Sequence, residues 1–514
     1  FSLTFCNLSL ILNKRKTFLS KSFLSKIYLF KTYLLMTQSE ALNILKTGAN
    51  VFLTGEPGSG KTHTINEYIK YLNQHHIDPA ITASTGIAAT HIGGITIHSW
   101  SGIGIKNSLN KYDLDKISST EYVSKRIRRT HVLIIDEVSM LSGKTLSMVD
   151  AVCREVRQDN SPFGGLQIIF VGDFFQLPPI MKNNSSGNNS SGNNSYDNNS
   201  SDNYYDSNFE TEGRQNRLID ELPDSRFACD SPAWQNAKPV ICYLTEQYRQ
   251  DDSVFTSILS SIRKNNFTEE HLIHIEKRKI IHSNAPTGIP KLFSHNVAVD
   301  QVNDDTLEKI NSEKKFFEMT MHGPMPLVTA LIKGCLSPEK LALKIGASVM
   351  FTKNNPREGY INGTLGTVTG FSRTSLQPLV KTVHGATIEA SPLEWTIEEN
   401  GSVKAKITQL PLRLAWAITV HKSQGMSLDA AVMDLSKVFE YGQGYVALSR
   451  VRRLSGLHLL GWNSRAFQVH PEILEKDESF RFLSDNAENE FGKISKKELS
   501  KMHKDFIKFC GGKK

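Results

Sequence analysis

The sequence predicts an α/β fold with parallel sheets, and three observations support this class. From residue 51 to 171, apolar strand-like runs alternate with helical stretches, which is the pattern of βαβ units. The octet GEPGSGKT, residues 55 to 62, joins one such strand to the following helix. A later strand, Val132 to Ile135, ends in the acidic pair Asp136-Glu137. A glycine-rich loop of this kind needs a carboxylate downstream, so the two motifs belong together.

The octet matches the phosphate-loop pattern in full and lies in the required strand, loop, helix context. Its glycines let backbone N–H groups point at phosphates, where the dipole of the next helix favours negative charge. We expect Lys61 to reach the β- and γ-phosphates. The Thr62 hydroxyl is placed to bind Mg²⁺ directly, and Asp136 is expected to hold the same ion indirectly, through the ligands that surround it. Glu137 is the predicted base for the attacking water.

The alternative to a nucleotide site is a glycine-rich turn followed by a chance acidic pair. Two motifs that agree in order and context disfavour that alternative. The predicted nucleotide contacts in the loop are Gly55, Glu56, Pro57, Gly58, Ser59, Gly60, Lys61 and Thr62.

Further motifs follow along the chain in a fixed order. They are TASTGIAA (82–89), GGITIHSWSGIG (93–104), DEVSM (136–140), PFGG (162–165), GDFFQLPP (172–179), LTEQYRQ (244–250), TVHKSQGMSLD (419–429) and YVALSRVR (445–452). This ordered set resembles the Pif-one family of superfamily 1B DNA helicases. The resemblance covers about Thr37 to Trp462, and the PFGG run ahead of GDFFQLPP favours this family in particular.

The resemblance implies two RecA-like P-loop motor domains with parallel sheets, plus a small SH3-like β-barrel inserted in the second. We expect the first motor domain at 36–235 and the second at 236–475, with the insertion at about 344–410. There the period of two and the hairpin signal Asn362-Gly363 indicate short strands. In the family such a domain closes over single-stranded DNA; a purely structural barrel is the alternative. Residues 100–128 are expected to form the small element that splits the duplex.

The resemblance also implies roles around the nucleotide. Gln38 matches the glutamine that reads adenine, and Gln176 matches the one that senses the γ-phosphate. Arg249 and Arg450 match two arginines that reach this phosphate from the second motor domain, where they stabilise the charge on the transferring phosphoryl group. For each arginine, a surface salt bridge is the alternative. Gln424 and Gly425 complete the predicted nucleotide contacts.

The candidates for DNA contact lie at loop ends, where an open parallel sheet exposes its binding groups. They are Thr85, Gly86, His98, Phe174, His421, Lys422 and Ser423. Hydroxyls, a lysine and backbone N–H groups can hold phosphate and sugar without reading bases. Trp100, Phe174 and Phe175 can stack on bases, and the alternative for these aromatic residues and for His98 is packing in the core.

Bulk composition is that of an ordinary multidomain globular protein, with 514 residues, 39% of them apolar. Residues 1–35 carry six basic residues and no acidic one, so without them the net charge falls from +8 to +2. Net charge is therefore weak evidence for nucleic acid. The cysteines form no CxxC pattern, which argues against a zinc site or a disulfide framework and favours an intracellular location. No run of about 18 uncharged apolar residues occurs, so we expect no membrane-spanning segment.

Three segments are expected to lie apart from the folded core. Residues 1–35 precede Met36, the expected start, and we favour translated upstream sequence over an organelle transit peptide because they contain a single arginine. Residues 183–203 repeat Asn, Ser and Gly, which indicates a disordered insertion within the first motor domain; an assembly tract is the alternative. Residues 476–514 form a basic tail without an assigned role.

The sequence therefore predicts an ATP- and Mg²⁺-dependent DNA helicase that steps along single-stranded DNA and acts on tailed or forked duplexes. The 5′ to 3′ direction, and roles in replication, repair, recombination or telomere maintenance, come only from the resemblance. A phosphate-loop kinase or GTPase is disfavoured because a second motor domain would be unexplained. A RecD-like helicase and a DNA-stimulated ATPase that remodels DNA without unwinding remain as alternatives.

Overall fold

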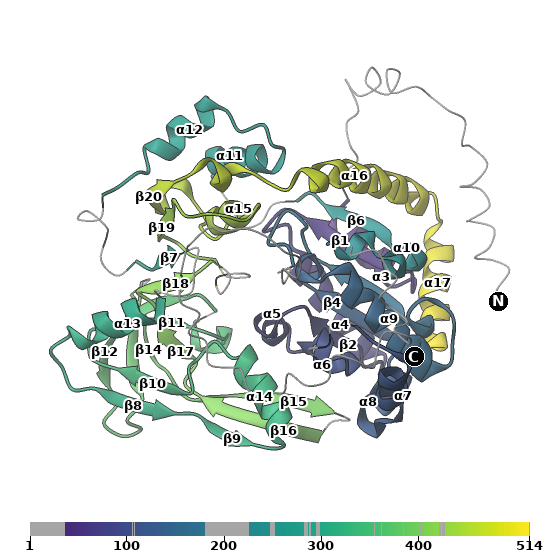
Figure 1. The fold of residues 1–514 in the computed structure, drawn as a ribbon, viewed down its shortest axis with the longest axis horizontal. Coiled ribbons are helices and arrows are strands. Elements are labelled where there is room, and N and C mark those ends of the chain that lie inside the picture. Colours follow the sequence, from purple (N-terminus) through teal and green to yellow (C-terminus); the bar gives the residue numbers. More distant parts are fainter. Residues whose placement is uncertain are drawn as a thin grey trace, which may run out of the picture. The chain divides into compact units, whose positions relative to one another are not determined.

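The structure is a computed structural model. It describes residues 36–104, 106, 108–179, 226–246, 252–281, 286, 289–293, 299–353, 355–360, 362–383, 385–399, 402–420, 423 and 427–512. Our expectations for residues 1–35 and for the insertion at 183–203 fall outside these residues. The helices and strands are labelled in Figure 1.

The part of the chain predicted to be the first motor domain, called the first domain below, is built on a six-stranded sheet with the order β3-β2-β4-β5-β1-β6. Its strands are β1 (Val51–Gly55), β2 (Ala80–Ala83), β3 (Ile95–Thr96), β4 (Val132–Asp136), β5 (Gln167–Val171) and β6 (Val240–Leu244). Every pairing in it is parallel. All residues of β1 and β5 are buried, which is typical of a parallel sheet covered on both faces. The predicted α/β class is confirmed for this part of the chain.

Helices alternate with the strands of this sheet, and a capping box marks the start of two of them. They are α3 (Gln38–Leu45), α4 (Lys61–Gln74), α5 (Gly86–His91), α6 (Ile97–Ser101), α7 (Lys111–Ser119), α8 (Glu121–Arg129), α9 (Gly143–Arg157) and α10 (Pro232–Ala237). Thr37 and Glu40 form a capping box that begins α3, and Asn110 and Asp113 form one that begins α7. Residues 100–128, expected to form the element that splits the duplex, contain α7 and α8, which both pack on α9.

Strand β6 corrects the predicted domain boundary. We expected Val240 to Tyr243 to open the second motor domain, but β6 pairs in parallel with β1, from Val51 opposite Val240 to Gly55 opposite Leu244. It is the outer strand of the first sheet. An apolar run identifies a strand, but it contains no information about which sheet the strand joins, because that choice depends on distant partners.

The part of the chain predicted to be the second motor domain, called the second domain below, has its own parallel sheet with the order β18-β7-β19-β20. Its strands are β7 (Lys291–Phe293), β18 (Ala417–Thr419), β19 (Ala431–Leu435) and β20 (Leu457–Trp462). Its helices are α11 (Ser253–Arg263), α12 (Glu269–Glu276), α13 (Val299–Glu308) and α15 (Gln443–Leu448). One cluster of buried apolar side chains includes Phe52 and Phe174 from the first domain and Met433 from the second, so the two domains share a core.

The insertion in the second domain is rich in strands, as predicted, but the SH3-like barrel is not confirmed. The strands β11 (Ser348–Phe351), β12 (Leu365–Phe371), β13 (Pro378–Thr382), β14 (Thr387–Glu389) and β17 (Leu412–Leu414) form a five-stranded antiparallel sheet. Among the described residues no pairing joins its end strands β14 and β17, so the sheet stays open. Alternation of apolar and polar residues predicts strands. Closure of the sheet into a barrel depends on a long-range strand pairing, about which this alternation contains no information.

The insertion also extends beyond the range we expected. Strands β15 (Leu393–Glu399) and β16 (Ser402–Gln409) form a second antiparallel sheet with β9 (Thr320–His322). Strands β8 (Lys315–Glu318) and β10 (Lys340–Leu343) pair with each other, and helix α14 (Met325–Gly334) packs on both β16 and α5. The β-rich region thus begins near residue 315, upstream of the predicted start at 344.

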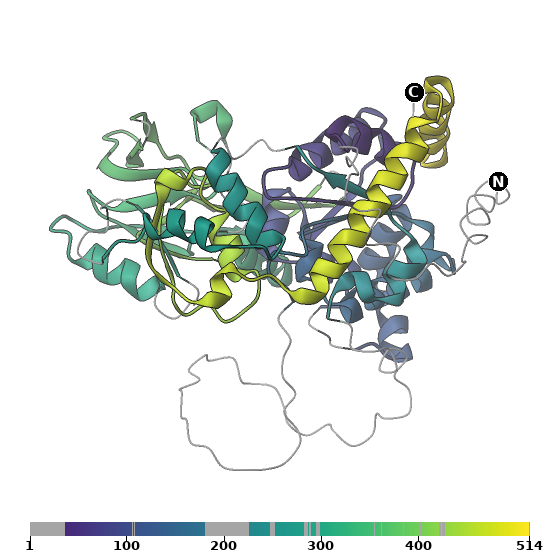
Figure 2. The same cartoon turned by 90° about the horizontal axis from the view of Figure 1, so that it is seen from above.

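The predicted basic tail is part of the folded protein. Helix α16 (Pro471–Gly492) packs along β6, and both are labelled in Figure 1. Figure 2 shows this long helix running toward the C-terminal end of the chain. Helix α17 (Lys496–Phe509) buries Phe506 and Ile507 in the same cluster as Met36. The sequence analysis placed this tail apart from the folded core, but the apolar residues between its lysines form a face that docks on the first domain. Among the described helices, none is long and apolar enough to cross a membrane.

Candidate active site

The phosphate loop joins β1 to α4 with a backbone that demands glycine. Gly60 has a φ of 87°, and a Cβ placed there would lie 2.0 Å from Nε2 of Gln38. Because Gly60 caps α4, no side chain among the described residues caps the first turn of the helix, whose N–H groups suit an anion. The Ser59 hydroxyl oxygen is buried and has no hydrogen-bond partner within the described part of the chain. These features fit the phosphate groups of a bound nucleotide.

The Lys61 side chain lies on the loop itself. Its Nζ donates hydrogen bonds to the carbonyl oxygens of Gly55, at 2.8 Å, and Glu56, at 3.1 Å. The ammonium group is therefore held inside the loop that would surround the phosphates. Compact and strongly charged, it can exchange these neutral acceptors for phosphate oxygens without leaving the loop.

Gln38, the predicted adenine reader, lies beside the phosphate loop. Its Nε2 donates to the carbonyl oxygen of Ser59 at 3.3 Å, and its backbone N–H donates to a carboxylate oxygen of Glu246 at 3.3 Å. Position next to the loop agrees with the prediction, and the adenine contact itself stays a prediction.

The acidic pair stands at the carboxyl end of β4. The backbone N–H of Glu137 donates to Oδ1 of Asp136 at 2.9 Å. Burial, together with the neighbouring charge of Glu137, raises the pKa of Asp136 to about 7. Glu137 has a φ of 51°, a left-handed conformation that is uncommon outside glycine and often marks functional sites.

The oxygen groups of Thr62 and Asp136 are of the kind that Mg²⁺ prefers. A nearby dication would favour the ionised form of Asp136 and so offset the effect of burial on its pKa. The residues present therefore fit the predicted metal. When bound, Mg²⁺ would neutralise charge on the β- and γ-phosphates.

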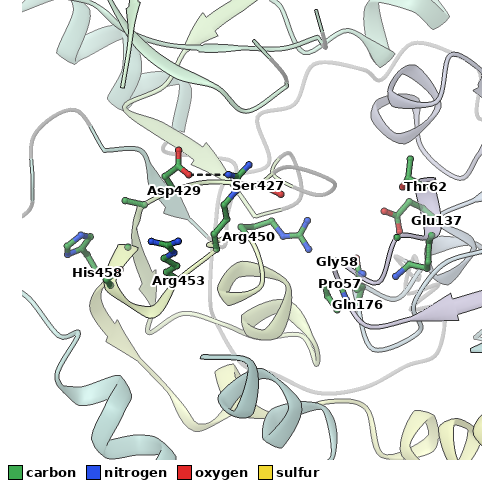
Figure 3. Close-up of a pocket in the computed structure, with 16 residues that line it drawn as sticks. Pro57, Gly58, Thr62, Glu137, Gln176, Ser427, Asp429, Arg450, Arg453 and His458 are labelled. Atoms are coloured by element: carbon green, nitrogen blue, oxygen red, sulfur yellow. Dashed lines mark ion pairs between the residues drawn. The ribbon is translucent and has the colours of Figure 1, made fainter. Parts of the chain in front are cut away.

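A cavity of about 980 Å³ lies in front of the phosphate loop and takes its walls from both motor domains. Its lining residues are Pro57, Gly58, Gly60, Lys61, Thr62, Glu137 and Gln176 from the first domain, and Ser427, Asp429, Ala430, Arg450, Arg452, Arg453, Ser455, Gly456 and His458 from the second. Figure 3 shows Arg450 extending from the second domain toward the side of the cavity that holds Glu137 and Thr62. Four of the predicted catalytic residues, Lys61, Glu137, Gln176 and Arg450, thus line one cavity.

Arg450 is held in place by its own domain. Only 1% of the residue is exposed, its Nε donates to the carbonyl oxygen of Val446 at 2.9 Å, and its Nη2 donates to Oγ of Ser449 at 2.8 Å. An arginine that is buried and aligned in this way can meet developing charge on a phosphate without a large loss of side-chain entropy. Arg249, Gln424 and Gly425 lie outside the described residues.

The aromatic candidates for DNA stacking are core residues. Phe174 is 4% exposed, and its ring lies 5.5 Å from that of Phe52 and 6.0 Å from that of Trp234. Trp100 and Phe175 are also buried. The prediction that Phe174 contacts DNA is therefore wrong for this structure, because a ring enclosed by other rings offers no face to a base.

The polar candidates for DNA contact differ in their surroundings: Thr85 and Gly86 lie at a helix start, whereas His98 and Ser423 are partly or fully buried. Thr85 lies at the start of α5, where its hydroxyl accepts a hydrogen bond from the N–H of Ala88 at 3.2 Å, and Gly86 opens the helix. His98 on α6 is partly buried, and this burial lowers its pKa and favours the neutral ring. Ser423 is fully buried, and its hydroxyl donates to the carbonyl of Val420 at 2.7 Å, so the predicted DNA contact is not formed by this hydroxyl. His421 and Lys422 fall outside the described residues.

Comparison with known proteins identifies the family. The PIF1-like helicase model matches residues 33–200, and the model of the DNA helicase Pif1 2B domain matches residues 327–371. The chain is 39% identical over 534 residues to the ATP-dependent DNA helicase Pif1 of Psychrobacter sp. (strain PRwf-1), with 93% of this chain and 75% of that protein covered. This chain belongs to the PIF1-like helicase family. The resemblance stated from the motifs is confirmed, and with it the family's activity, ATP-dependent DNA unwinding.

Solved structures of PIF1-like helicases have the same fold. The chain matches Bacteroides sp. Pif1 in complex with ADP-AlF4 with a TM-score of 0.71 and 27% identity, over 88% of this chain and 98% of that one. It also matches Pif1 helicase from Bacteroides in complex with ADP-AlF3 and single-stranded DNA, with a TM-score of 0.58 and 27% identity, over 88% of this chain and 99% of that one.

Several residues of the PIF1-like site were missed in the sequence. Arg452 and Arg453 line the cavity beside Arg450, and Nη1 of Arg452 lies 3.6 Å from Oδ1 of Asp429. His458 lines the cavity from β20, where burial lowers its pKa. Three arginines within four residues were a visible signal for an anionic ligand, but the motif assigned a role only to the first of them.

Proposed function

We propose that this PIF1-like helicase is an ATP- and Mg²⁺-dependent motor that moves along single-stranded DNA from 5′ to 3′ and opens tailed or forked duplexes. The observation that carries the proposal is the shared cavity: Lys61 and Gln176 line it from one motor domain and Arg450 from the other. A triphosphate in this cavity would be held by both domains at once. Its cleavage would then change the contact between them.

In the proposed cycle, Lys61, Gln176 and Arg450 hold the γ-phosphate and close the cavity. Glu137 accepts a proton from the attacking water, and Arg450 stabilises the charge that spreads over the phosphoryl group. Loss of that phosphate removes the shared ligand, so the domains separate. Alternate closing and opening moves the DNA contacts of one domain relative to those of the other.

The proposed partner is single-stranded DNA held through its sugar-phosphate backbone. Thr85 and Gly86 support this because they lie at the end of β2, on the edge of the sheet that carries the nucleotide motifs. A hydroxyl and backbone N–H groups suit a motor that has to pass every base with equal ease.

The α7 and α8 element is proposed to separate the duplex. It carries two large aromatic side chains in solvent, Tyr112 on α7, which is 71% exposed, and Tyr122 on α8, which is 56% exposed. Exposed rings of this kind can stack on a base at the point where a pair opens.

The test measures ATP hydrolysis with and without single-stranded DNA, then unwinding of duplexes that carry either a 5′ or a 3′ tail. We expect hydrolysis to rise with DNA and unwinding to require the 5′ tail. Lys61→Ala should abolish hydrolysis and leave DNA binding intact. Unwinding from the 3′ tail alone would refute the direction, and hydrolysis without any strand separation would favour a remodelling ATPase.

A further inference from the structure

A buried arginine of the second motor domain reaches into the first. Arg263, the last residue of α11, is 1% exposed, and its Nη1 lies 2.7 Å from Oδ2 of the fully buried Asp173 in the loop after β5. Its Nη2 donates to the hydroxyl of Tyr243 on β6 at 2.8 Å. Its Nη1 also donates to the hydroxyl of Tyr445 on α15 at 3.3 Å. One guanidinium thus binds oxygens from both domains.

The C-terminal helix and an aromatic ring complete this set of contacts. Nη2 of Arg263 lies 3.5 Å from Oδ1 of Asp477 on α16. The guanidinium carbon lies 4.2 Å from the centre of the Phe175 ring, a cation–π arrangement. A planar donor group with five N–H bonds can serve several acceptors at once, which an ammonium group cannot do in the same way.

The two segments that Arg263 joins carry γ-phosphate residues of the proposed site. On one side, the carbonyl of Asp173 accepts the N–H of Gln176 at 3.0 Å, so the pair with Arg263 fixes the loop of Gln176. On the other side, Tyr445 lies in the helix whose Val446 carbonyl holds Nε of Arg450 at 2.9 Å. Arg263 is therefore two contacts away from Gln176 and from Arg450.

A close backbone approach supports the same connection independently. Gly442 caps the start of α15 with a φ of 76°. A Cβ at this position would lie 2.4 Å from the carbonyl oxygen of Phe175 and 3.0 Å from that of Gln176. The helix that precedes Arg450 thus touches the loop that carries Gln176, and this contact leaves no space for a side chain.

The charges make this junction difficult to separate. Burial, the largest single effect, lowers the pKa of Arg263, but Asp173 acting together with Tyr243, Tyr445 and Asp477 outweighs it, and the pKa lies well above its usual value. Parting the two would leave uncompensated charge in the interior of the protein, which is strongly unfavourable. The junction is therefore expected to stay closed while the cavity beside it opens and closes.

We propose that Arg263 is a positioning residue and the pivot about which the two motor domains close on ATP. It fixes the position of the loop of Gln176 relative to the helix before Arg450, so that the side chains of Gln176 and Arg450 contact the same phosphate. This inference rests on the domain closure proposed above, and it adds the point that stays fixed during that movement.

The first test compares Arg263→Lys with a matched control, Arg157→Lys. Arg157 also bonds several carbonyl oxygens, including that of Thr130 at 2.9 Å and that of Gly164, but all of them belong to the first domain. We expect Arg263→Lys to lower the DNA-stimulated kcat about tenfold, since small misplacements of reacting groups reduce rates by this order. The KM for ATP should stay within about twofold, because the phosphate loop is unchanged. Arg157→Lys should change neither constant.

A gentler pair of variants keeps the test valid if Arg263→Lys does not fold. Tyr445→Phe removes only the hydroxyl that Arg263 contacts, and Tyr68→Phe removes a buried hydroxyl that donates to Gln167 at 2.8 Å within the first domain. We expect about a threefold lower kcat for the first variant and wild-type kcat for the second, with similar losses of thermal stability.

The outcomes separate this inference from the proposed function. Equal kcat for Tyr445→Phe and Tyr68→Phe, in a protein whose wild type is stimulated by DNA, would overturn the pivot alone. A wild type without stimulation by DNA would instead refute the motor. A lower kcat in Tyr445→Phe with an unchanged KM supports the pivot, because a merely structural residue would not change one constant without the other at equal stability.

Discussion

Replacement of Arg450 by alanine tests whether one nucleotide is shared by two motor domains. Arginines that reach a transferring phosphoryl group contribute about 10³ to 10⁵ in kcat. Arg450 faces the phosphate loop across the cavity and is already aligned by its bonds to Val446 and Ser449, so its loss removes a preorganised charge. We expect kcat to fall about a thousandfold, which corresponds to about 4 kcal/mol of transition-state stabilisation.

The same substitution should also lower stability, so the loss of activity has to be compared with a control that loses stability alone. Two hydrogen bonds from a charged donor are lost within the second domain, together worth about 3 kcal/mol. Arg154 offers a control, since it also makes two contacts within one domain, to Asp150 at 2.9 and 3.1 Å, and it does not line the cavity. Arg154→Ala should therefore lower stability and leave kcat within about twofold of wild type.

The assay is steady-state ATP hydrolysis at saturating single-stranded DNA, with DNA affinity measured on the same preparations. Arg450→Ala should bind single-stranded DNA like the wild type, because Arg450 lines the nucleotide cavity and is not one of the predicted DNA contacts. Arg450→Lys should restore only a small part of kcat, since a point charge does not replace a planar fork. Wild-type kcat in a folded Arg450→Ala protein would show that Arg450 does not act on the phosphate, and the shared site would lose its basis.

Three further predictions concern packing. Phe174→Ala should lower the free energy of unfolding by about 4 kcal/mol while the folded protein keeps its affinity for single-stranded DNA, measured by fluorescence anisotropy; weaker DNA binding at unchanged stability would restore the stacking role. Gly60→Ala should weaken ATP binding at least tenfold in a nucleotide titration, because the new Cβ meets Gln38 and strains a left-handed residue. Phe506→Ala should lower the melting temperature by several degrees, as its ring packs on Gly48; an unchanged melting curve would mean that α17 adds no stability.

The nucleotide side of the site could be predicted from the sequence because its chemistry is local. Gly60, Lys61 and Thr62 are neighbours in the chain, and their geometry follows from one loop between one strand and one helix. Prediction of Asp136 and Glu137 required only that the end of a buried strand be recognised in the sequence. In each case, the residues that determine the conformation lie within a few positions of the residue that does the chemistry.

Elements whose place depends on distant partners could not be predicted in this way. Strand β6 belongs to the first sheet because it pairs with β1, and no residue in Val240–Leu244 indicates that partner. The lysines of α17 were visible, but Phe506 docks into the apolar cluster that contains Met36 and so joins opposite ends of the described chain. Long-range contacts of this kind are specified by the whole core and not by a local pattern.

The predicted DNA contacts of Phe174 and Ser423 failed for a related reason. Phe174 and Ser423 belong to motifs from which the resemblance predicted DNA contacts, and the motif alone does not say whether a side chain faces outward or supports one that does. Both are buried, Phe174 among aromatic rings and Ser423 on the carbonyl of Val420. Arg263 shows the converse, because it lies in no motif we recognised and yet contacts Asp173 of the GDFFQLPP run. Buried residues that pack against a motif are as strongly constrained as residues that contact a ligand. The burial of a motif residue therefore has to be known before the residue is assigned to either role.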